Sequence, residues 1–325
     1  MKMQFWNSLL LIAALGCAFT HAQQPAPNGV DAHRLAAQRA AGLEYPGLLS
    51  RLCVVPPNKE NSPPPSATLR PVPNRSSWYA PPFKVFDNLY WVGTKIHSSW
   101  ALTTSDGIIL IDTLYNYASE PEIVDGLTKL GLDPAKVKYV IVSHGHGDHD
   151  EGANLMQQRF HAHIIMGGPD WDAIEKAHPM PGGTPKRDMV ATDGEKLALG
   201  DTTVTIVFTP GHTLGTLSLL FQVKDQGKPL NVVYSGGTAF NNQFDAERFQ
   251  MYIASQRKLA RLAADSSATV LLSNHSEFDD AYTKARLLAT RKPGEPNPFE
   301  VGSESVARYF TTTDECAQAA LIEYK

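Results

Sequence analysis

The chain has 325 residues, of which 42% are hydrophobic and 19% charged, and 29 basic against 33 acidic side chains give it a formal charge of −4. This composition is typical of a globular protein with a large core, and it excludes a disordered chain, a collagen, a coiled coil and a multi-span membrane protein. The weakly acidic balance gives no electrostatic reason to expect a nucleic-acid partner.

The first 22 residues have the pattern of a secretory signal peptide. Lys2 precedes an apolar stretch over residues 9–18 that is too short to span a bilayer, and small residues favour cleavage after Ala22. We therefore expect a periplasmic or secreted protein with no stable membrane insertion after cleavage. A buried N-terminal helix is one alternative interpretation, and lipidation at Cys17 is another.

Residues 23–78 form a Pro-rich arm with a predicted helix over 31–41, which we expect to pack on the rest of the chain. Removal of the signal peptide leaves Cys53 in the arm and Cys316 near the C-terminus. In an oxidising compartment these two could form a disulfide, and two separate buried thiols are the equal alternative. Neither cysteine has neighbours that suggest catalysis.

Residues 79–325 contain no predicted linker and form one domain of catalytic size in which strands and helices mix. Apolar runs bounded by turn residues predict strands over 83–86, 89–92, 100–104, 107–111, 137–143, 164–166, 197–199, 204–208, 216–222, 232–235 and 269–273. Helices are predicted over 119–130, 151–160, 169–176, 245–264, 278–290 and 306–320. Residues 177–188, rich in Pro and Gly, are predicted to form a loop. The pattern favours an α/β fold of two packed sheets with helices outside both.

A dense cluster of metal-binding side chains follows the predicted strand 137–143. Within six residues the chain carries three histidines and a carboxylate, His144, His146, Asp148 and His149. Gly145 and Gly147 allow a tight backbone path, so that alternate side chains can converge on one point. Imidazoles with one carboxylate suit zinc. A set of surface histidines in a glycine loop is the alternative.

Two distant histidines have the same setting, in a loop directly after a predicted strand. His212 follows the strand over 204–208, and His275 follows the strand over 269–273. With the cluster they make five histidines and one aspartate, enough for two zinc ions with three protein ligands each. Each ion would keep an open position for water, which is the arrangement of a catalytic site.

The other histidines carry weaker signals. His161 and His163 lack the glycines and the partner carboxylate, so we interpret them as surface or packing residues. His97 and His178 lie in predicted loops, where either could reach a cleft but nothing requires it. The chain has no phosphate-binding G-x-x-x-x-G-K motif and no nucleophile motif G-x-S-x-G.

The H-x-H-x-D-H motif over 144–149 resembles that of the metallo-β-lactamase superfamily. The segments around His212 and His275 resemble the family's later metal-binding histidines, and 107–112 is similar to the strand and aspartate that precede the motif. The similarity covers roughly residues 80–290 and implies a four-layer αββα sandwich, here with an N-terminal extension. It implies two zinc ions per chain, the first on His144, His146 and His212 and the second on Asp148, His149 and His275.

One segment narrows the resemblance. Most hydrolases of the superfamily have a bridging Asp after the strand that here covers 232–235, and the first two lactamase subclasses have a metal-binding Cys there. This chain has Ser235-Gly236-Gly237-Thr238 instead. The third subclass of class B β-lactamases also lacks both and is the most similar group. That subclass usually holds the drug's carboxylate with serines in this region, where here only Ser235 and Thr238 offer hydroxyls.

The resemblance therefore implies an exported dizinc hydrolase that opens the β-lactam ring, a cyclic amide, by attack of a zinc-bound hydroxide, and so confers antibiotic resistance. Asp148 would be the catalytic residue that orients the hydroxide and relays a proton. The alternatives are a dizinc hydrolase of the same fold acting on a lactone, ester or other small molecule, an iron-dependent oxidoreductase, and a non-catalytic zinc-binding module.

Substrate contacts are harder to place from the sequence. The loop over 177–188 and the segment over 97–100 are predicted to form walls of the substrate cleft, and Trp100 either contacts the substrate or lies in the core. Ser235 and Thr238 are the other substrate-binding candidates. The sequence leaves the oligomeric state open.

Overall fold

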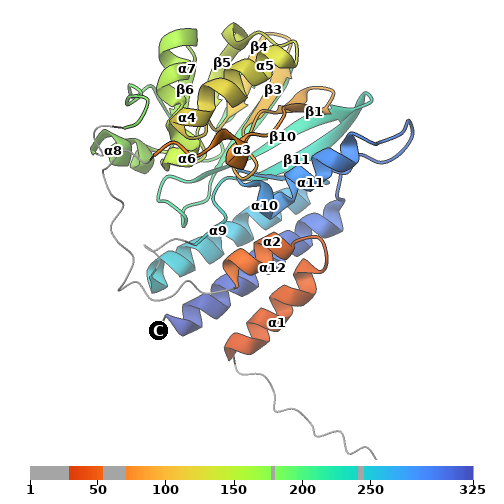
Figure 1. The fold of residues 1–325 in the computed structure, drawn as a ribbon. Coiled ribbons are helices and arrows are strands. Elements are labelled where there is room, and N and C mark those ends of the chain that lie inside the picture. The colour runs from red at the N-terminus through yellow and green to blue at the C-terminus, as the bar shows by residue number, and fades with distance from the viewer. Residues whose placement is uncertain (1–28, 54–70, 177–179, 241–244, 325) are drawn as a thin grey trace, which may run out of the picture.

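The computed structural model describes residues 29–53, 71–176, 180–240 and 245–324. The expected signal peptide, Cys17 and the most Pro-rich part of the arm lie outside these residues. No helix within the described residues is long and apolar enough to cross a bilayer. Two sheets, each covered by helices on its outer face, make up the α/β fold that the sequence predicts (Figure 1).

The first sheet has seven strands in the order β1 to β7. Strands β1 to β4 pair antiparallel and β4 to β7 pair parallel, so that β2, β4 and β5 all end at one edge. The strands are β1 (Phe83–Phe86), β2 (Leu89–Trp91), β3 (Trp100–Thr104), β4 (Gly107–Ile111), β5 (Val137–Ile141), β6 (His163–Met166) and β7 (Met189–Val190). Its helices are α3 (Arg75–Trp78), α4 (Asn116–Ala118), a π-helical turn (Ser119–Val124), α5 (Asp125–Lys129), α6 (Gly147–Asp150), α7 (Ala153–Phe160) and α8 (Gly168–Lys176).

The second sheet has five strands in the order β12-β11-β10-β9-β8. Only β11 and β12 pair parallel, and β9, β11 and β12 therefore end at the same edge. The strands are β8 (Lys196–Leu199), β9 (Thr202–Phe208), β10 (Leu217–Asp225), β11 (Lys228–Ser235) and β12 (Val270–Ser273). The helices that follow are α9 (Ala246–Asp265), α10 (Ser276–Asp279), α11 (Ala281–Leu288) and α12 (Ser303–Glu323).

Both faces of the sheets are buried, because apolar side chains point both ways from the central strands. In β4, Ile109 and Ile111 pack between the sheets, whereas Ile108 and Leu110 face helices α4 to α8. This explains why β4 and β5 read as continuous apolar runs rather than alternating ones. The three apolar layers between four layers of secondary structure form the αββα sandwich (Figure 1).

The N-terminal arm packs on the C-terminal helix. Helices α1 (Gly29–Ala41) and α2 (Pro46–Leu52) lie against α12, and their apolar faces join the layer outside the second sheet (Figure 1). Cys53 and Cys316 form a disulfide with their Cα atoms 4.7 Å apart, across 263 residues of sequence. Of the two interpretations of these cysteines, the structure has the bridge.

Several predicted boundaries were wrong. The helix predicted over 278–290 is broken at Asp280, whose positive φ of 55° ends α10 and begins α11. The helix predicted over 119–130 begins earlier, at Asn116, and contains the π-helical turn. No prediction covered α2, α3 or the short strand β7. The predicted loop over 177–188 is irregular in its described part, 180–188, and the division of the chain at residue 78 stays a prediction.

Candidate metal centre

Loops from both sheets meet at the edge where their strands end. The loop after β5 carries residues 144–149, the loop after β9 carries His212, and the loop after β12 carries His275. A fourth loop, between β2 and β3, carries His97. Because β2, β5, β9 and β12 end on the same side of the sandwich, side chains distant in the sequence converge there.

The first group consists of His144, His146 and His212, and one ring nitrogen from each lies within 4.8 Å of the others. His146 Nδ1 is 3.0 Å from His212 Nε2. The remaining ring nitrogens are held by backbone carbonyls, since His144 Nδ1 donates to Gly236 O at 2.9 Å and His212 Nδ1 donates to Ala239 O at 2.6 Å. A carbonyl can only accept, so these bonds place the ring proton on Nδ1 and the lone pair on Nε2 in both His144 and His212.

The second group gathers around one carboxylate oxygen. Asp148 Oδ2 lies 3.1 Å from His149 Nε2, 3.2 Å from His275 Nε2 and 3.5 Å from His97 Nε2. The Nε2 atoms of His149 and His275 are themselves 3.2 Å apart. The structure therefore brings together all six side chains predicted as zinc ligands, and adds His97 to them.

The donor set fits zinc. Bonds of about 2 Å at tetrahedral angles place neighbouring ligand atoms about 3.3 Å apart. Five nitrogen–nitrogen and nitrogen–oxygen distances within the two groups run from 3.0 to 3.5 Å. In addition, His144 Nε2 is buried without a hydrogen-bond partner among the described residues, which is costly unless another group binds it.

A buried carboxylate behind the second group fixes His149. Asp112 Oδ2 accepts from His149 Nδ1 at 3.0 Å and from the Tyr234 hydroxyl at 2.7 Å. Ser143 donates to the same carboxylate through its backbone N–H at 2.6 Å and its hydroxyl at 2.9 Å. Such a carboxylate holds the ring in the Nδ1–H tautomer and raises the basicity of Nε2. Asp112 has a positive φ of 64°, a strained conformation for a residue other than glycine.

Asp170, at the start of α8, connects the loops of the first group. Its carboxylate accepts from the N–H of Gly145 at 2.9 Å, the hydroxyl of Thr213 at 2.7 Å and the N–H of Gly215 at 3.1 Å. One side chain thus holds the loop of His146 against the loop of His212. Sequence reasoning missed Asp170, because it acts on backbone groups and has no motif of its own.

His149 of the second group differs in protonation from the histidines of the first group. Burial and the neighbouring His146 lower the pKa of His212 to about 3, and burial with the other histidines lowers the pKa of His144 well below its usual range. These imidazoles are neutral at neutral pH, as ligands must be. For His149, burial alone would lower the pKa, but Asp148 and Asp112 outweigh it and raise the pKa to about 10. A metal ion at the second group must therefore displace a proton.

The sequence profile of the metallo-beta-lactamase superfamily matches residues 92–273. The chain belongs to the metallo-β-lactamase superfamily. Its structure is similar to BJP-1, a subclass B3 metallo-β-lactamase of Bradyrhizobium japonicum, with 30% identity and a TM-score of 0.65 over 76% of this chain and 96% of that one. It is similar also to the FEZ-1 metallo-β-lactamase of Legionella gormanii, with 26% identity and a TM-score of 0.67 over 78% and 99% of the two chains.

Curated relatives act on other substrates. The chain is 26% identical over 221 residues to a hydroxyacylglutathione hydrolase of Rhodopseudomonas palustris, covering 63% of this chain and 80% of the relative. It is 36% identical over 118 residues to the N-acyl homoserine lactonase AttM of Agrobacterium fabrum, covering 33% and 44% respectively. The comparisons confirm the predicted resemblance to the third lactamase subclass and leave the substrate open.

The structure corrects the predicted substrate contacts. Trp100 is fully buried between the sheets and donates its indole N–H to Ser273 O at 3.0 Å, so it belongs to the core. Ser235 and Thr238 are also buried; their hydroxyl oxygens lie 3.1 Å apart, and that of Thr238 lies 2.9 Å from the hydroxyl of Tyr309. None of the three presents a polar group to a substrate.

The predicted loop over 177–188 borders the helix that follows the metal motif. Asn154 and Gln157 of α7 donate side-chain N–H groups to Gly182 O and Lys186 O, each at 2.8 Å. Its role as a wall of the cleft stays a prediction. Of the histidines interpreted as peripheral, His163 is exposed and pairs with Asp188, whereas His178 lies outside the described residues.

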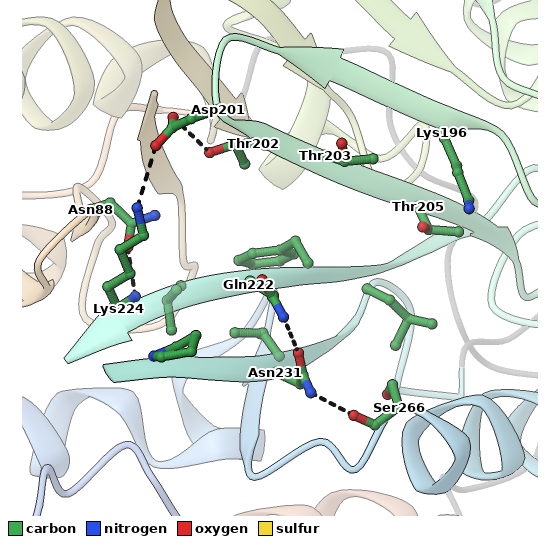
Figure 2. Close-up of a pocket in the computed structure, with 15 residues that line it drawn as sticks. Asn88, Lys196, Asp201, Thr202, Thr203, Thr205, Gln222, Lys224, Asn231 and Ser266 are labelled. Atoms are coloured by element: carbon green, nitrogen blue, oxygen red, sulfur yellow. Dashed lines mark hydrogen bonds and ion pairs between the residues drawn. The ribbon is translucent and has the colours of Figure 1, made fainter. Parts of the chain in front are cut away.

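A hollow of about 530 Å³ lies elsewhere on the molecule (Figure 2). Its labelled residues include Thr203 and Thr205 of β9, Lys224 near the end of β10 and Asn231 of β11. These positions are at the sheet edge opposite the histidines. None of its lining residues is a histidine, an aspartate of the two groups or a neighbour of either.

Proposed function

We propose that the protein is an exported dizinc hydrolase that opens the ring of β-lactams. The observation that carries this proposal is the backbone path after β11. A Cβ atom on Gly236 would lie 1.7 Å from Leu217 O, and one on Gly237 would lie 2.8 Å from the Cβ of His212. A side chain at either position would force its neighbours to shift, and the two glycines leave the bridging aspartate of other superfamily hydrolases without a counterpart there. This favours the third lactamase subclass over the glyoxalase and lactonase patterns.

Each of the two groups would hold one zinc ion. His144, His146 and His212 would hold the first zinc ion, and Asp148, His149 and His275 the second. When bound, the ions supply a hydroxide at neutral pH and polarise the carbonyl of the substrate. Asp148 follows His146 in the same loop and has a pKa held well below its usual range, because His149 and His275 outweigh the effect of burial. As a carboxylate it would orient the attacking hydroxide and accept its proton.

Export is supported by one structural feature. The disulfide between Cys53 and Cys316 requires an oxidising compartment such as the periplasm or the extracellular space. The signal peptide over residues 1–22 would direct the chain there.

A second candidate is a hydrolase of the same two-zinc type acting on an apolar lactone or ester. Ile96 and Leu214, which lie on the loops of His97 and His212, are both about half exposed. They give the candidate centre apolar neighbours, and the hydroxyls of Ser235 and Thr238 are buried rather than presented to a drug carboxylate. The N-acyl homoserine lactonase relatives fit this candidate.

The experiment is a substrate panel on the zinc-loaded protein with and without chelator. The panel holds a penicillin, a cephalosporin, a carbapenem, an N-acyl homoserine lactone and a hydroxyacylglutathione. We expect chelator-sensitive turnover of the three lactams with kcat/KM of about 10⁴ M⁻¹s⁻¹ or more. His146→Ala should abolish it, whereas His163→Ala, a histidine outside the centre, should not. Turnover of the lactone or thioester alone would replace the lactamase proposal with the second candidate.

A further inference from the structure

His97 is held at the centre by backbone hydrogen bonds between two loops. Ser98 N–H donates to Asn274 O and Ser276 N–H donates to Ile96 O, both at 2.8 Å, so the loop between β2 and β3 pairs with the loop that carries His275. His97 and His275 face each other in this short antiparallel bridge. The two histidines therefore keep a fixed relation to each other.

The turn that carries His97 is itself closed. Thr94 N–H donates to His97 O at 2.7 Å, and His97 N–H donates to the hydroxyl of Thr94 at 2.9 Å. The His97 ring packs edge-on against the rings of His275 and Tyr115, with centroids 5.0 and 5.2 Å away. The side chain is only 15% exposed. Packing and the turn thus set its position.

The ring nitrogen of His97 points into the second group. Its Nε2 lies 3.5 Å from Asp148 Oδ2, the oxygen that His149 and His275 also approach. The ligand atoms of His97, Asp148 and His275 all lie within 4.8 Å of one another. Three imidazoles from three separate loops thus converge on one carboxylate oxygen.

A hydrogen bond accounts poorly for this contact. Charge-assisted N–H···O bonds are about 2.7–2.9 Å long, well short of the observed distance. The distance is close to the separation of about 3.3 Å between two ligands of one tetrahedral ion. It resembles the other distances of the group, which are 3.1 and 3.2 Å.

We propose that His97 is a fourth protein ligand at the second metal position, beside Asp148, His149 and His275. This inference rests on the two-metal part of the proposed function and is independent of the substrate. Four protein donors complete a tetrahedral zinc site, whereas three leave a position open. The first position would then be the open one, and the second ion would be held in a closed set of ligands.

The first test compares zinc affinities by competition with a chromophoric chelator. His97→Leu removes the ring nitrogen at similar volume, and His163→Ala is the control because His163 is exposed and paired with Asp188 away from the centre. We expect the second affinity of His97→Leu to fall by about tenfold or more, with the first affinity unchanged. The proposal would be overturned if a folded His97→Leu variant had the same two zinc affinities as the unmodified protein.

The second test uses the unmodified protein, so it does not depend on how a variant folds. With cobalt in place of zinc and nitrogen-15 in the histidine rings, ligand rings give contact-shifted resonances. We expect six such histidines, assigned by comparison with His97→Leu where that variant folds. Five would leave the two-metal centre intact and refute the role of His97. Uptake of a single metal ion by the unmodified protein would refute the two-metal centre itself.

Discussion

Asp112→Asn should weaken the second metal position without touching a ligand. The Asp112 carboxylate is fully buried and accepts four hydrogen bonds, three of them on Oδ2. An amide that keeps its oxygen toward Ser143 N–H places an NH₂ group against the donors His149 Nδ1 and Tyr234 hydroxyl. The variant therefore cannot hold His149 in the tautomer that presents Nε2 to a metal ion.

The magnitude follows from the bonds that are lost. Each hydrogen bond to a charged group contributes about 1.5–3 kcal/mol, and unmatched donors add a desolvation cost. We expect the free energy of unfolding to fall by about 3–5 kcal/mol, the range found when one partner of a buried ion pair is removed. Loss of a carboxylate that orients a ligating histidine costs about 10–100-fold in metal affinity, which is about 1.4–2.7 kcal/mol.

The assay is chelator competition for zinc, together with denaturant unfolding. The control is Asp188→Asn, which removes a carboxylate that accepts from His163 Nδ1 at 3.0 Å, away from the centre. The control should keep both zinc affinities. A folded Asp112→Asn protein with the second zinc affinity of the unmodified protein would refute the reasoning.

Three further predictions test other parts of the structure. Asp170→Asn should weaken the first zinc affinity about tenfold or more and the second by less, because its hydrogen bonds to Gly145, Thr213 and Gly215 lie beside the ligands of the first group; equal losses at both positions would count against this. Burial raises the pKa of Glu122 to about 8, so the stability that its protonated form provides is complete below pH 4.5 and falls as the pH rises through 8. Glu122→Gln should therefore be a few kcal/mol more stable than the unmodified protein at pH 9 and about equal at pH 5, and parallel stability curves would contradict this. Replacing Cys53 and Cys316 together by Ser should lower the free energy of unfolding by about 2–4 kcal/mol with unchanged zinc affinities, measured by denaturant titration of the zinc-loaded protein.

The sequence predicts much of this architecture because its signals are local. The apolar runs of β4 and β5 and the glycines beside His144 and His146 mark a strand end and a tight loop directly. His212 and His275 follow strands in the same way. The structure brings these side chains together. Their roles as metal ligands are proposals that the zinc measurements test.

The rest depends on contacts between segments distant in the sequence. His97 reaches the centre because its loop pairs with that of His275. The residues around His97 have no sequence pattern that predicts this pairing. Asp170 accepts hydrogen bonds from backbone N–H groups. Almost every residue has such a group, so residue types do not predict this contact. Trp100 could not be placed in advance, because a strand buried on both faces does not show which side chains line a cleft.

The zinc content of the purified protein and of two variants tests the central claim most directly. The account predicts two zinc ions per chain in the unmodified protein, one in His146→Ala, which loses the first position, and one in the double variant His149→Ala/His275→Ala, which loses the second. One zinc ion in the unmodified protein, or iron in its place, would contradict the dizinc centre and favour a different chemistry on this fold.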